Sequence, residues 1–198
     1  MRNIQLVLAS ASPRRQMLLS QIGLNFEICP SNVHEPPFTG GQPSDYARDL
    51  ARDKTNEIAS TLNNRLVVGA DTIVVVDDEV LGKPVDNEDA MRMLNLLSGR
   101  THEVVTAYNL QLRDEHIDVM EHVSTAVHFK QLSEEEIRRY VDSGAPMDKA
   151  GAYGIQDFSG VFVDRIQGCF YNVVGLPLAD FNTTLQSVLK QHNLQLSS

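Results

Sequence analysis

The first residues whose types could carry out chemistry lie at the junction between an apolar run and a helical segment. This segment, SASPRR, covers residues 10–15. The first turn of a helix has backbone N–H groups without partners and a partial positive charge, so it attracts anions. Ser10, Arg14 and Arg15 add hydroxyl and charged donors at that turn. The segment therefore predicts a phosphate site, with a simple serine cap beside two solvated arginines as the alternative.

Asp71 is the second candidate, because it interrupts an apolar run over residues 66–76. A buried ionised carboxylate costs several kcal/mol unless it is paired, hydrogen-bonded or bound to a metal. Gly69, two residues earlier, permits close approach by another group. We interpret Asp71 as a ligand of a divalent cation or as a general base for an attacking water. The alternative is a strand end or bulge that points Asp71 to water.

Further candidates are single residues in less distinctive surroundings. Lys83 lies in a Gly-Lys-Pro bend, where a lysine held in place can meet a phosphate. Lys54 lies near the apolar stripe of a predicted helix, and taken alone it is best explained by a stem packed on apolar surface. Glu35, in a proline-rich loop, is a candidate second metal carboxylate. Residues 145–156 are glycine-containing and irregular, which is typical of loops that shape binding sites.

These candidates need a scaffold, and the chain mixes predicted strands and helices throughout. Apolar runs and alternation predict strands over residues 4–9, 24–28, 66–76, 102–112 and 116–129, and the last two form a predicted hairpin joined by residues 113–115. Caps, prolines and glycines predict helices over residues 13–22 (capped by Ser12), 44–61 (capped by Ser44), 87–99, 133–144 (with a capping box of Ser133 and Glu136) and 177–192. Residues 30–43 predict an irregular loop and residues 150–168 a further strand pair. The order predicts an α/β fold with a mixed central sheet in a single domain, residues 1–198.

Composition narrows the class of protein. The chain has 198 residues, of which 42% are hydrophobic and 22% charged, so a packed globular interior is expected. Its 17 basic and 26 acidic residues give a net charge of −9, which argues against binding to nucleic acid. No run reaches the roughly 18 apolar residues needed to cross a bilayer, so no membrane segment is expected.

The N-terminus and the cysteines indicate a cytoplasmic protein. The apolar run of residues 4–9 is too short for the hydrophobic region of a signal peptide, so we interpret it as a first strand. Cys29 and Cys169 stand far apart with no zinc-site spacing, which predicts buried free thiols in a reducing compartment.

Six segments carry a family resemblance. They are Leu8–Arg15, Gly69–Thr72, Gly82–Pro84, Ser98–His102, Asp148–Gln156 and Asn172–Pro177. In this order they resemble the Maf family of nucleotide pyrophosphatases, and they span nearly the whole chain. The resemblance implies a mixed sheet flanked by helices and two lobes around a cleft, similar to the inosine triphosphate pyrophosphatases. It also implies hydrolysis at the α-phosphorus with a divalent cation, Mg²⁺ or Mn²⁺.

The resemblance assigns roles by position. The residues that it implies for phosphate binding are Ser10, Arg14, Arg15, Lys54 and Lys83. It makes Asp71 the catalytic base and Glu35 a metal partner of Asp71. These roles agree with the phosphate site and the unusual carboxylate found above.

The resemblance to one branch of that family implies which base the enzyme prefers. Arg15, Thr72 and Gln156 resemble the branch associated with UTP and dTTP, which places Thr72 and Gln156 among the substrate-binding residues. A glutamine amide both donates and accepts, matching the edge of uracil or thymine. A second branch, associated with 7-methyl-GTP, has an acidic residue near the Gln156 position, which suits a cationic base. Asp157, where the family pattern has glycine, is a departure that bears on loop shape or base preference.

The sequence thus predicts an enzyme that hydrolyses dTTP and UTP to the nucleoside monophosphate and pyrophosphate. Modified pyrimidine triphosphates are further candidate substrates. The alternatives are a non-catalytic nucleotide-binding regulator of cell division, a pyrophosphatase of the 7-methyl-GTP type, a phosphatase, and a nucleic-acid-binding module. The expected partner is the nucleoside triphosphate, without nucleic acid or membrane. The last helix packs on the domain or on a second copy, so a homodimer stays open.

Overall fold

The structure of the protein is a computed structural model that describes residues 1–197. The chain divides into two compact units. The first comprises Met1–Asp71, Thr106–His122 and the residues from Gly175 onward. The second comprises Thr72–Val105 and Val123–Val174. The prediction of one domain over the whole chain stays a prediction.

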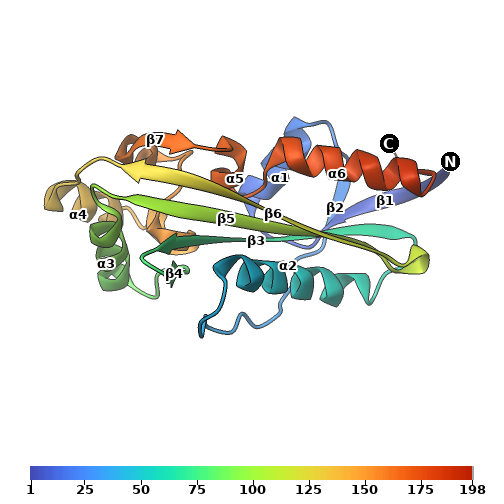
Figure 1. The fold of residues 1–198 in the computed structure, drawn as a ribbon, viewed down its shortest axis with the longest axis horizontal. Helices are drawn as coiled ribbons and strands as arrows, with labels where there is room; N and C mark the ends of the chain where they lie inside the picture. The colour runs from blue at the N-terminus through green and yellow to red at the C-terminus, as the bar shows by residue number, and fades with distance from the viewer. Residues whose placement is uncertain (198) are drawn as a thin grey trace. The chain divides into compact units, whose positions relative to one another are not determined.

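Within residues 1–197, eight strands form one mixed sheet in the order β2-β1-β3-β5-β6-β7, with β4 beside β3 and β8 beside β1 (Figure 1). Their bounds are β1 Arg2–Leu8, β2 Phe26–Ile28, β3 Arg65–Val76, β4 Glu79–Leu81, β5 Thr101–Leu112, β6 Ile117–Phe129, β7 Val163–Gln167 and β8 Leu194–Leu196. Strand β1 pairs in parallel with β2, β3 and β8, whereas β4 and β7 pair antiparallel with β3 and β6. The predicted mixed α/β architecture is confirmed.

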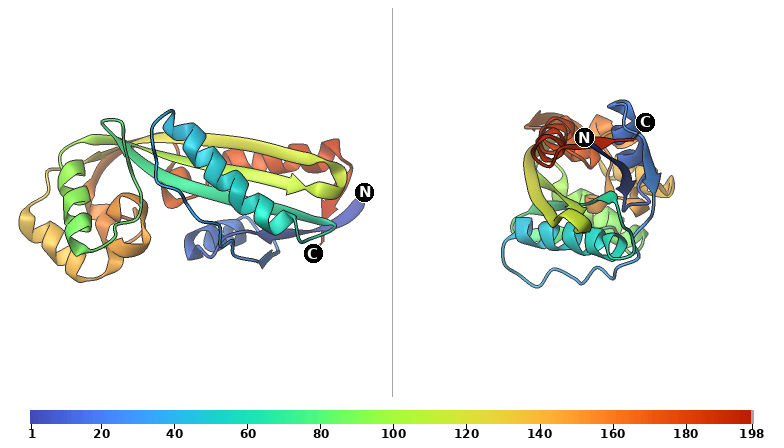
Figure 2. Two further views of the ribbon diagram at one scale, coloured as in Figure 1. Left: turned by 90° about the horizontal axis from the view of Figure 1, so that it is seen from below. Right: turned by 90° about the vertical axis from the view of Figure 1, so that its right-hand side faces the viewer.

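The first unit contains three helices, α1 (Pro13–Gln21), α2 (Pro43–Ala59) and α6 (Leu178–Gln191), within the described residues. Helices α2 and α6 lie on opposite sides of the strands of this unit (Figures 1 and 2). Apolar residues of α2 pack with residues of β1 and β3, in a cluster of Val7, Ala9, Ile58, Ala59 and Val67. The predicted stripe on α2 therefore does face the sheet, as its helical spacing indicated.

One predicted helix start is wrong. Helix α2 begins at Pro43 with Gln42 at the cap position, not after a Ser44 cap. Proline suits the first helical position because its φ is already helical and its missing N–H would have no partner there. Ser12 does occupy the cap position of α1, but its side chain makes no capping hydrogen bond.

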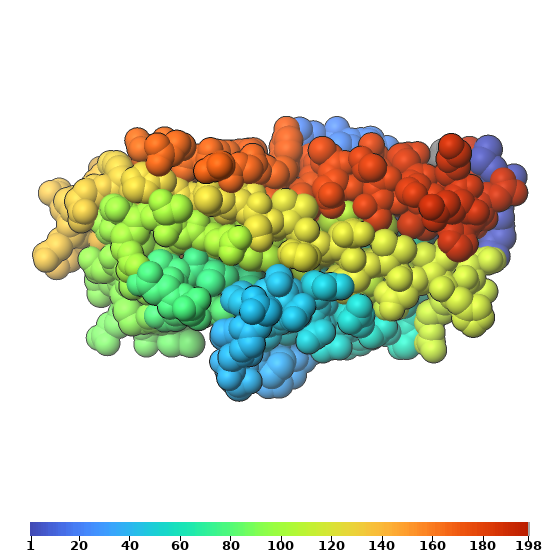
Figure 3. Space-filling model, in the orientation of Figure 1, coloured from blue at the N-terminus to red at the C-terminus, as the bar shows by residue number. Residues whose placement is uncertain are grey.

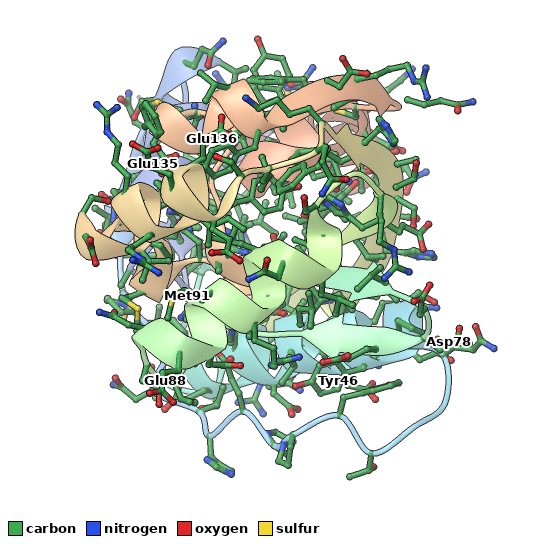
Figure 4. The ribbon with its side chains drawn as sticks, turned by 90° about the vertical axis from the view of Figure 1, so that its left-hand side faces the viewer. Tyr46, Asp78, Glu88, Met91, Glu135 and Glu136 are labelled. Atoms are coloured by element: carbon green, nitrogen blue, oxygen red, sulfur yellow. The ribbon has the colours of Figure 1, made fainter. Side chains whose placement is uncertain are left out.

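The second unit contains α3 (Asn87–Leu97), α4 (Glu134–Asp142) and α5 (Phe170–Val174). Figure 4 shows α3, which carries the labelled Glu88 and Met91, beside α4, which carries Glu135 and Glu136. The predicted capping box of α4 is confirmed, because Ser133 and Glu136 exchange side-chain and backbone hydrogen bonds. Aromatic rings form much of the core here, including Phe129, Tyr140, Tyr153 and Phe162.

The predicted strand pair within residues 150–168 is wrong. Only β7 is a strand, and the rest forms 3₁₀ turns, η3 (Ala150–Ala152) and η4 (Phe158–Phe162), after η2 (Ala145–Asp148). Ala152 has a φ of 61°, a left-handed conformation that turns the chain away from an extended path. By contrast, the predicted hairpin of β5 and β6 is confirmed, with its turn at Arg113–Glu115 (η1).

Two further expectations concern the whole chain. Across residues 1–197, no helix combines the length and the apolar character that crossing a bilayer requires. Cys29 and Cys169 carry free thiols, but both are half-buried rather than buried.

Candidate functional site

Asp71 lies inside β3, and only 7% of its surface is exposed. Helix α2 packs directly onto β3 two residues earlier, at Gly69. A Cβ atom at Gly69 would collide with Thr55 Oγ1 and lie 2.8 Å from the carbonyl oxygen of Ala51. This approach brings the neighbouring Lys54 to the strand, where its Nζ donates to Asp71 Oδ1 at 2.5 Å. The interpretation of Gly69 as a point of close approach is confirmed.

Lys54 contacts a second carboxylate as well. Its Nζ lies 2.7 Å from Glu35 Oε1, so one ammonium group joins β3 to the proline-rich loop. The Lys54 side chain is 13% exposed and that of Glu35 is 43% exposed. The interpretation of Lys54 as a lysine with a packed stem and a solvated head is therefore wrong, because the charged head is held between two carboxylates.

The start of α1 supplies positive charge to the same unit. Arg15 Nη1 donates to Ser10 Oγ at 3.2 Å, and Arg15 Nε donates to the carbonyl oxygen of Gly175 at 3.0 Å. Ser10 Oγ also accepts the backbone N–H of Ser12 at 3.2 Å. These bonds fix the guanidinium of Arg15 beside the first turn of α1, with Arg14 next to it in the sequence.

The charges of these groups shift one another's pKa values. Burial raises the pKa of Asp71, while the charges of Lys54 and Arg15 oppose that shift. Burial lowers the pKa of Arg15, and the nearby Asp71 opposes this. We call Arg15, Glu35, Lys54 and Asp71 the charge cluster. A carboxylate with a raised pKa, held by cations, is a form that general bases take in enzymes.

Tyr46 is a residue of this region whose polar role the sequence did not reveal. Its hydroxyl donates to the carbonyl oxygen of Pro36 at 2.8 Å, next to Glu35, and its ring packs on Phe38 with centroids 5.4 Å apart. Burial, followed by the charges of Asp71 and Glu35, raises the pKa of Tyr46. The loop that it ties down stands out on the surface in Figure 3, and Tyr46 is labelled in Figure 4.

A divalent cation at this site would need oxygen ligands. No group of three or more His, Cys, Asp or Glu side chains within residues 1–197 is arranged to hold a metal by itself. However, Mg²⁺ is commonly held by one or two carboxylates together with substrate phosphate oxygens and water. Asp71 and Glu35 share Lys54 as a partner and supply such hard oxygen donors. The residues present therefore fit a cation that binds together with a phosphate substrate.

The remaining predicted residues belong to the second unit. Thr72 follows Asp71 on β3, and Lys83 is exposed just after β4. The N–H of Gly151 donates to the carbonyl oxygen of Gly82 at 3.0 Å, so the bend of Lys83 is joined to the loop that carries Gln156. The structure thus brings the two second-unit segments together, and the roles of Thr72, Lys83 and Gln156 stay predictions.

The first unit therefore holds six of the predicted site residues: Ser10, Arg14, Arg15, Glu35, Lys54 and Asp71. Hydrogen bonds and ion pairs join Arg15 to Ser10, and Lys54 to both Glu35 and Asp71. Such an arrangement can hold an anion beside a buried carboxylate. It defines the chain as an α/β protein with a site suited to phosphate chemistry.

The comparisons with known proteins agree with that class. The family model described as Maf-like protein matches residues 5–188, and the chain belongs to this family. A dTTP/UTP pyrophosphatase of Geobacter sulfurreducens is 49% identical over 184 residues, covering 93% of this chain and 96% of that protein. Another, of Citrifermentans bemidjiense, is 46% identical over 188 residues, covering 95% and 97%.

Among solved structures, a HAM1 protein from Coxiella burnetii is similar to 94% of this chain and to all of that chain. The sequence identity is 16% and the TM-score is 0.49, so this likeness supports no conclusion. The fold class rests on the mixed sheet of the chain itself.

Proposed function

We propose that this protein is a nucleoside triphosphate pyrophosphatase that hydrolyses dTTP and UTP to the nucleoside monophosphate and pyrophosphate. Relatives with this activity in their names, 46% and 49% identical over almost the whole chain, support the substrate class. The observation that carries the reaction type is the buried carboxylate of Asp71 bonded to Lys54, in the unit that holds Arg15 at the first turn of α1.

In the proposed reaction, a water molecule attacks the α-phosphorus and Asp71 accepts its proton. The bond from the α-phosphorus to the bridging oxygen breaks, and pyrophosphate leaves with that oxygen. Arg14, Arg15 and Lys54 offset the negative charge of the triphosphate, which grows on the leaving group. Lys54 also favours the ionised form of the Asp71 carboxylate and orients it before the nucleotide binds.

A divalent cation, Mg²⁺ or Mn²⁺, would be held by Asp71 and Glu35. When bound, it would supply charge neutralisation to the phosphate oxygens and lower the pKa of a coordinated water. Asp71 can serve as the base or as a ligand, and both roles use the same buried carboxylate. We expect chelation with EDTA to abolish turnover and addition of Mg²⁺ or Mn²⁺ to restore it. Full activity in EDTA would remove the cation from the proposal.

The second unit contributes the predicted specificity. We propose that Lys83 binds phosphate, that Thr72 contacts the substrate and that the Gln156 amide pairs with the edge of a pyrimidine. We also propose that the enzyme acts in the cytoplasm, in line with its free cysteines. No nucleic-acid partner is expected, because the net charge of −9 opposes binding to phosphate backbones.

The test is a screen of ordinary and modified triphosphates with identification of both products. UTP and dTTP should yield the monophosphate and pyrophosphate faster than the purine triphosphates or 7-methyl-GTP. Release of orthophosphate would instead identify a phosphatase. Tight nucleotide binding without any product would support a regulatory protein, and preference for 7-methyl-GTP would place the chain in the other branch.

A further inference from the structure

Asp157, the residue that follows Gln156, is held in the loop by an extensive set of contacts within the second unit. Its Oδ1 accepts the backbone N–H of Ser159 at 2.9 Å and the hydroxyl of Ser159 at 2.6 Å. Its Oδ2 lies 3.3 Å from Lys149 Nζ, and the hydroxyl of Tyr140 lies 3.3 Å from both oxygens. The carboxylate of Asp157 is therefore directed at three residues of its own unit.

These contacts close a turn around Gln156. The N–H of Asp157 donates to the carbonyl oxygen of Gly154 at 3.0 Å, which makes Ile155 and Gln156 the central residues of a β-turn. On the other side, the N–H of Gly154 donates to Ser159 Oγ at 2.9 Å. The turn is thus tied through its backbone and again through the side chains of Asp157 and Ser159. Gln156 is an exposed residue of a turn whose two ends are fixed.

Lys149 anchors this turn to the rest of the loop. Its ammonium group has three N–H donors and meets three acceptors, the carbonyl oxygen of Ala145 at 2.5 Å, Asp148 Oδ1 at 2.6 Å and Asp157 Oδ2. The Lys149 side chain is 12% exposed, and its stem packs so closely on Gly154 that a Cβ atom there would lie 2.7 Å from Lys149 Cε. Asp157 thereby completes the coordination of a nearly buried cation.

The Tyr140 contact adds a donor that keeps its proton. Burial, and then the charge of Asp157, raise the pKa of the Tyr140 phenol, although hydrogen bonds from Ser159 oppose this. The hydroxyl therefore remains a donor at all physiological pH values. Tyr140 also packs edge-on against Phe162, with ring centroids 5.4 Å apart, which fixes the phenol within the core.

From this geometry we infer that Asp157 is a positioning residue that presents Gln156 to the base, and so sets the discrimination between pyrimidine and other nucleotides. The inference rests on the proposed function. The negative charge of Asp157 is engaged by Lys149, Tyr140 and Ser159, so it does not serve as a counter-charge for a cationic base. Without these bonds, the turn would occupy several conformations, and only a fraction of molecules would offer the Gln156 amide correctly.

The experiment is steady-state hydrolysis of UTP, GTP and 7-methyl-GTP by the wild-type protein and by Asp157→Asn. The variant should raise KM for UTP roughly tenfold while kcat stays within about twofold, because charged hydrogen bonds are lost without any change in the chemical step. The ratio of kcat/KM for UTP over GTP should fall by a similar factor. Asp157→Glu should recover part of that ratio, since it restores the charge.

Asp148→Asn is the matched control. Asp148 also bonds to Lys149 Nζ, but its side chain is 60% exposed and it lies before the turn. This variant should leave the UTP-to-GTP ratio unchanged. Tyr140→Phe, which removes one contact to Asp157, should shift the ratio in the same direction as Asp157→Asn and by less, and it provides the test if Asp157→Asn fails to fold.

Each outcome has a distinct meaning. If the wild-type protein releases no pyrophosphate from UTP, the proposed function fails. If the wild-type protein prefers UTP and both Asp157→Asn and Tyr140→Phe keep that preference, the function stands and the inference is overturned. A wild-type protein that hydrolyses 7-methyl-GTP, and loses only that activity in Asp157→Asn, would show that Asp157 acts directly on a cationic base and would also overturn the inference.

Discussion

The two units hold their buried polar groups by different means. In the first unit, full charges meet directly, since Lys54 bonds to both Asp71 and Glu35 and the charge of Arg15 acts on Asp71. In the second unit, the polar side chains buried as deeply as Asp71 are neutral, as in the hydrogen bond of 2.8 Å between His102 Nε2 and the hydroxyl of Tyr153. The charged pair beside Gln156 joins Lys149, whose side chain is 12% exposed, to Asp157, which at 31% is more exposed than Asp71 at 10%.

This difference separates reaction from recognition in the proposed enzyme. The charge cluster has Asp71 on a strand and Lys54 on a helix, regular elements that hold side chains precisely. Gln156 instead sits on a turn that side-chain bonds fix. Changes in the first unit should therefore alter the rate for every nucleotide, whereas changes around the turn should alter the choice among nucleotides.

The largest expected effect comes from removing the charge of Asp71. Asp71→Asn should lower kcat by about a hundredfold or more for all triphosphates, since a general base is lost while nucleotide binding is largely kept. Stopped assays of pyrophosphate release, with a separate binding titration, would measure this. Asp78→Asn, an exposed carboxylate at the β3–β4 turn, is the control and should behave as wild type. Retained activity in Asp71→Asn would remove the proposed base.

The next effect concerns the bridging cation. Lys54→Met should lower kcat by about 10- to 100-fold, because a preorganised positive charge beside the reacting phosphate is lost. Arg52→Met is a matched control on the same helix, since Arg52 pairs only loosely, at 3.9 Å, with the exposed Asp49. If Lys54→Met and Arg52→Met had equal activity, the charge cluster would have no part in the reaction.

The interior of the second unit should respond to acid. Burial, and then the charge of His128, lower the pKa of His102 to about 3. In the unfolded chain, the His102 imidazole takes up a proton near pH 6.5. The contribution of buried neutral His102 to the free energy of unfolding is therefore fully present above about pH 6.5, and it is lost at about 1.4 kcal/mol per pH unit as the pH falls toward 3.

His102→Gln, which keeps an amide near Tyr153, should flatten this dependence. Between pH 7 and pH 5, the free energy of unfolding should fall by about 2 kcal/mol more in wild type than in the variant. Urea unfolding at the two pH values gives the comparison. Curves that fall in parallel would show that His102 is not held neutral.

The smallest effect tests the loop of Glu35. Tyr46→Phe removes the hydrogen bond to Pro36 and should lower kcat/KM about fivefold for all nucleotides, because a single neutral hydrogen bond contributes about 1 kcal/mol. Tyr108→Phe is the control in the same unit. It removes bonds to Asp180 and Thr184, so it should lower the melting temperature without changing turnover. If Tyr108→Phe lowered turnover and Tyr46→Phe left it unchanged, the role of Tyr46 would be contradicted.

Much of the fold could be predicted because its signals are local. The apolar run of β3, the capping box of α4 and the three-residue turn between β5 and β6 each lie within a short stretch of sequence. The prediction for residues 150–168 was wrong because their left-handed turns depend on contacts with residues far away in the sequence, such as the hydrogen bond from Gly151 to Gly82. The short elements α5 and β8 were missed, since a few residues carry no clear period.

The site shows the same limit. Asp71 stood out because a carboxylate in an apolar run is costly, and Gly69 indicated that something must pack there. The partner of Asp71 could not be identified, since Lys54 is 17 residues away and resembles any helix lysine until the helix is placed on the strand. Nothing in the spacing of Tyr46 along α2 indicated that its hydroxyl would donate to the carbonyl oxygen of Pro36.

Gly69 has a consequence for how the protein can vary. A single hydrogen atom in place of a methyl group lets the backbone of α2 rest against the strand, and this sets the reach that Lys54 must cover. Alanine at this position would act as a spacer that lifts the helix away, with the ammonium group carried along. Residue 69 should therefore tolerate no larger side chain without a compensating change in the helix that faces it.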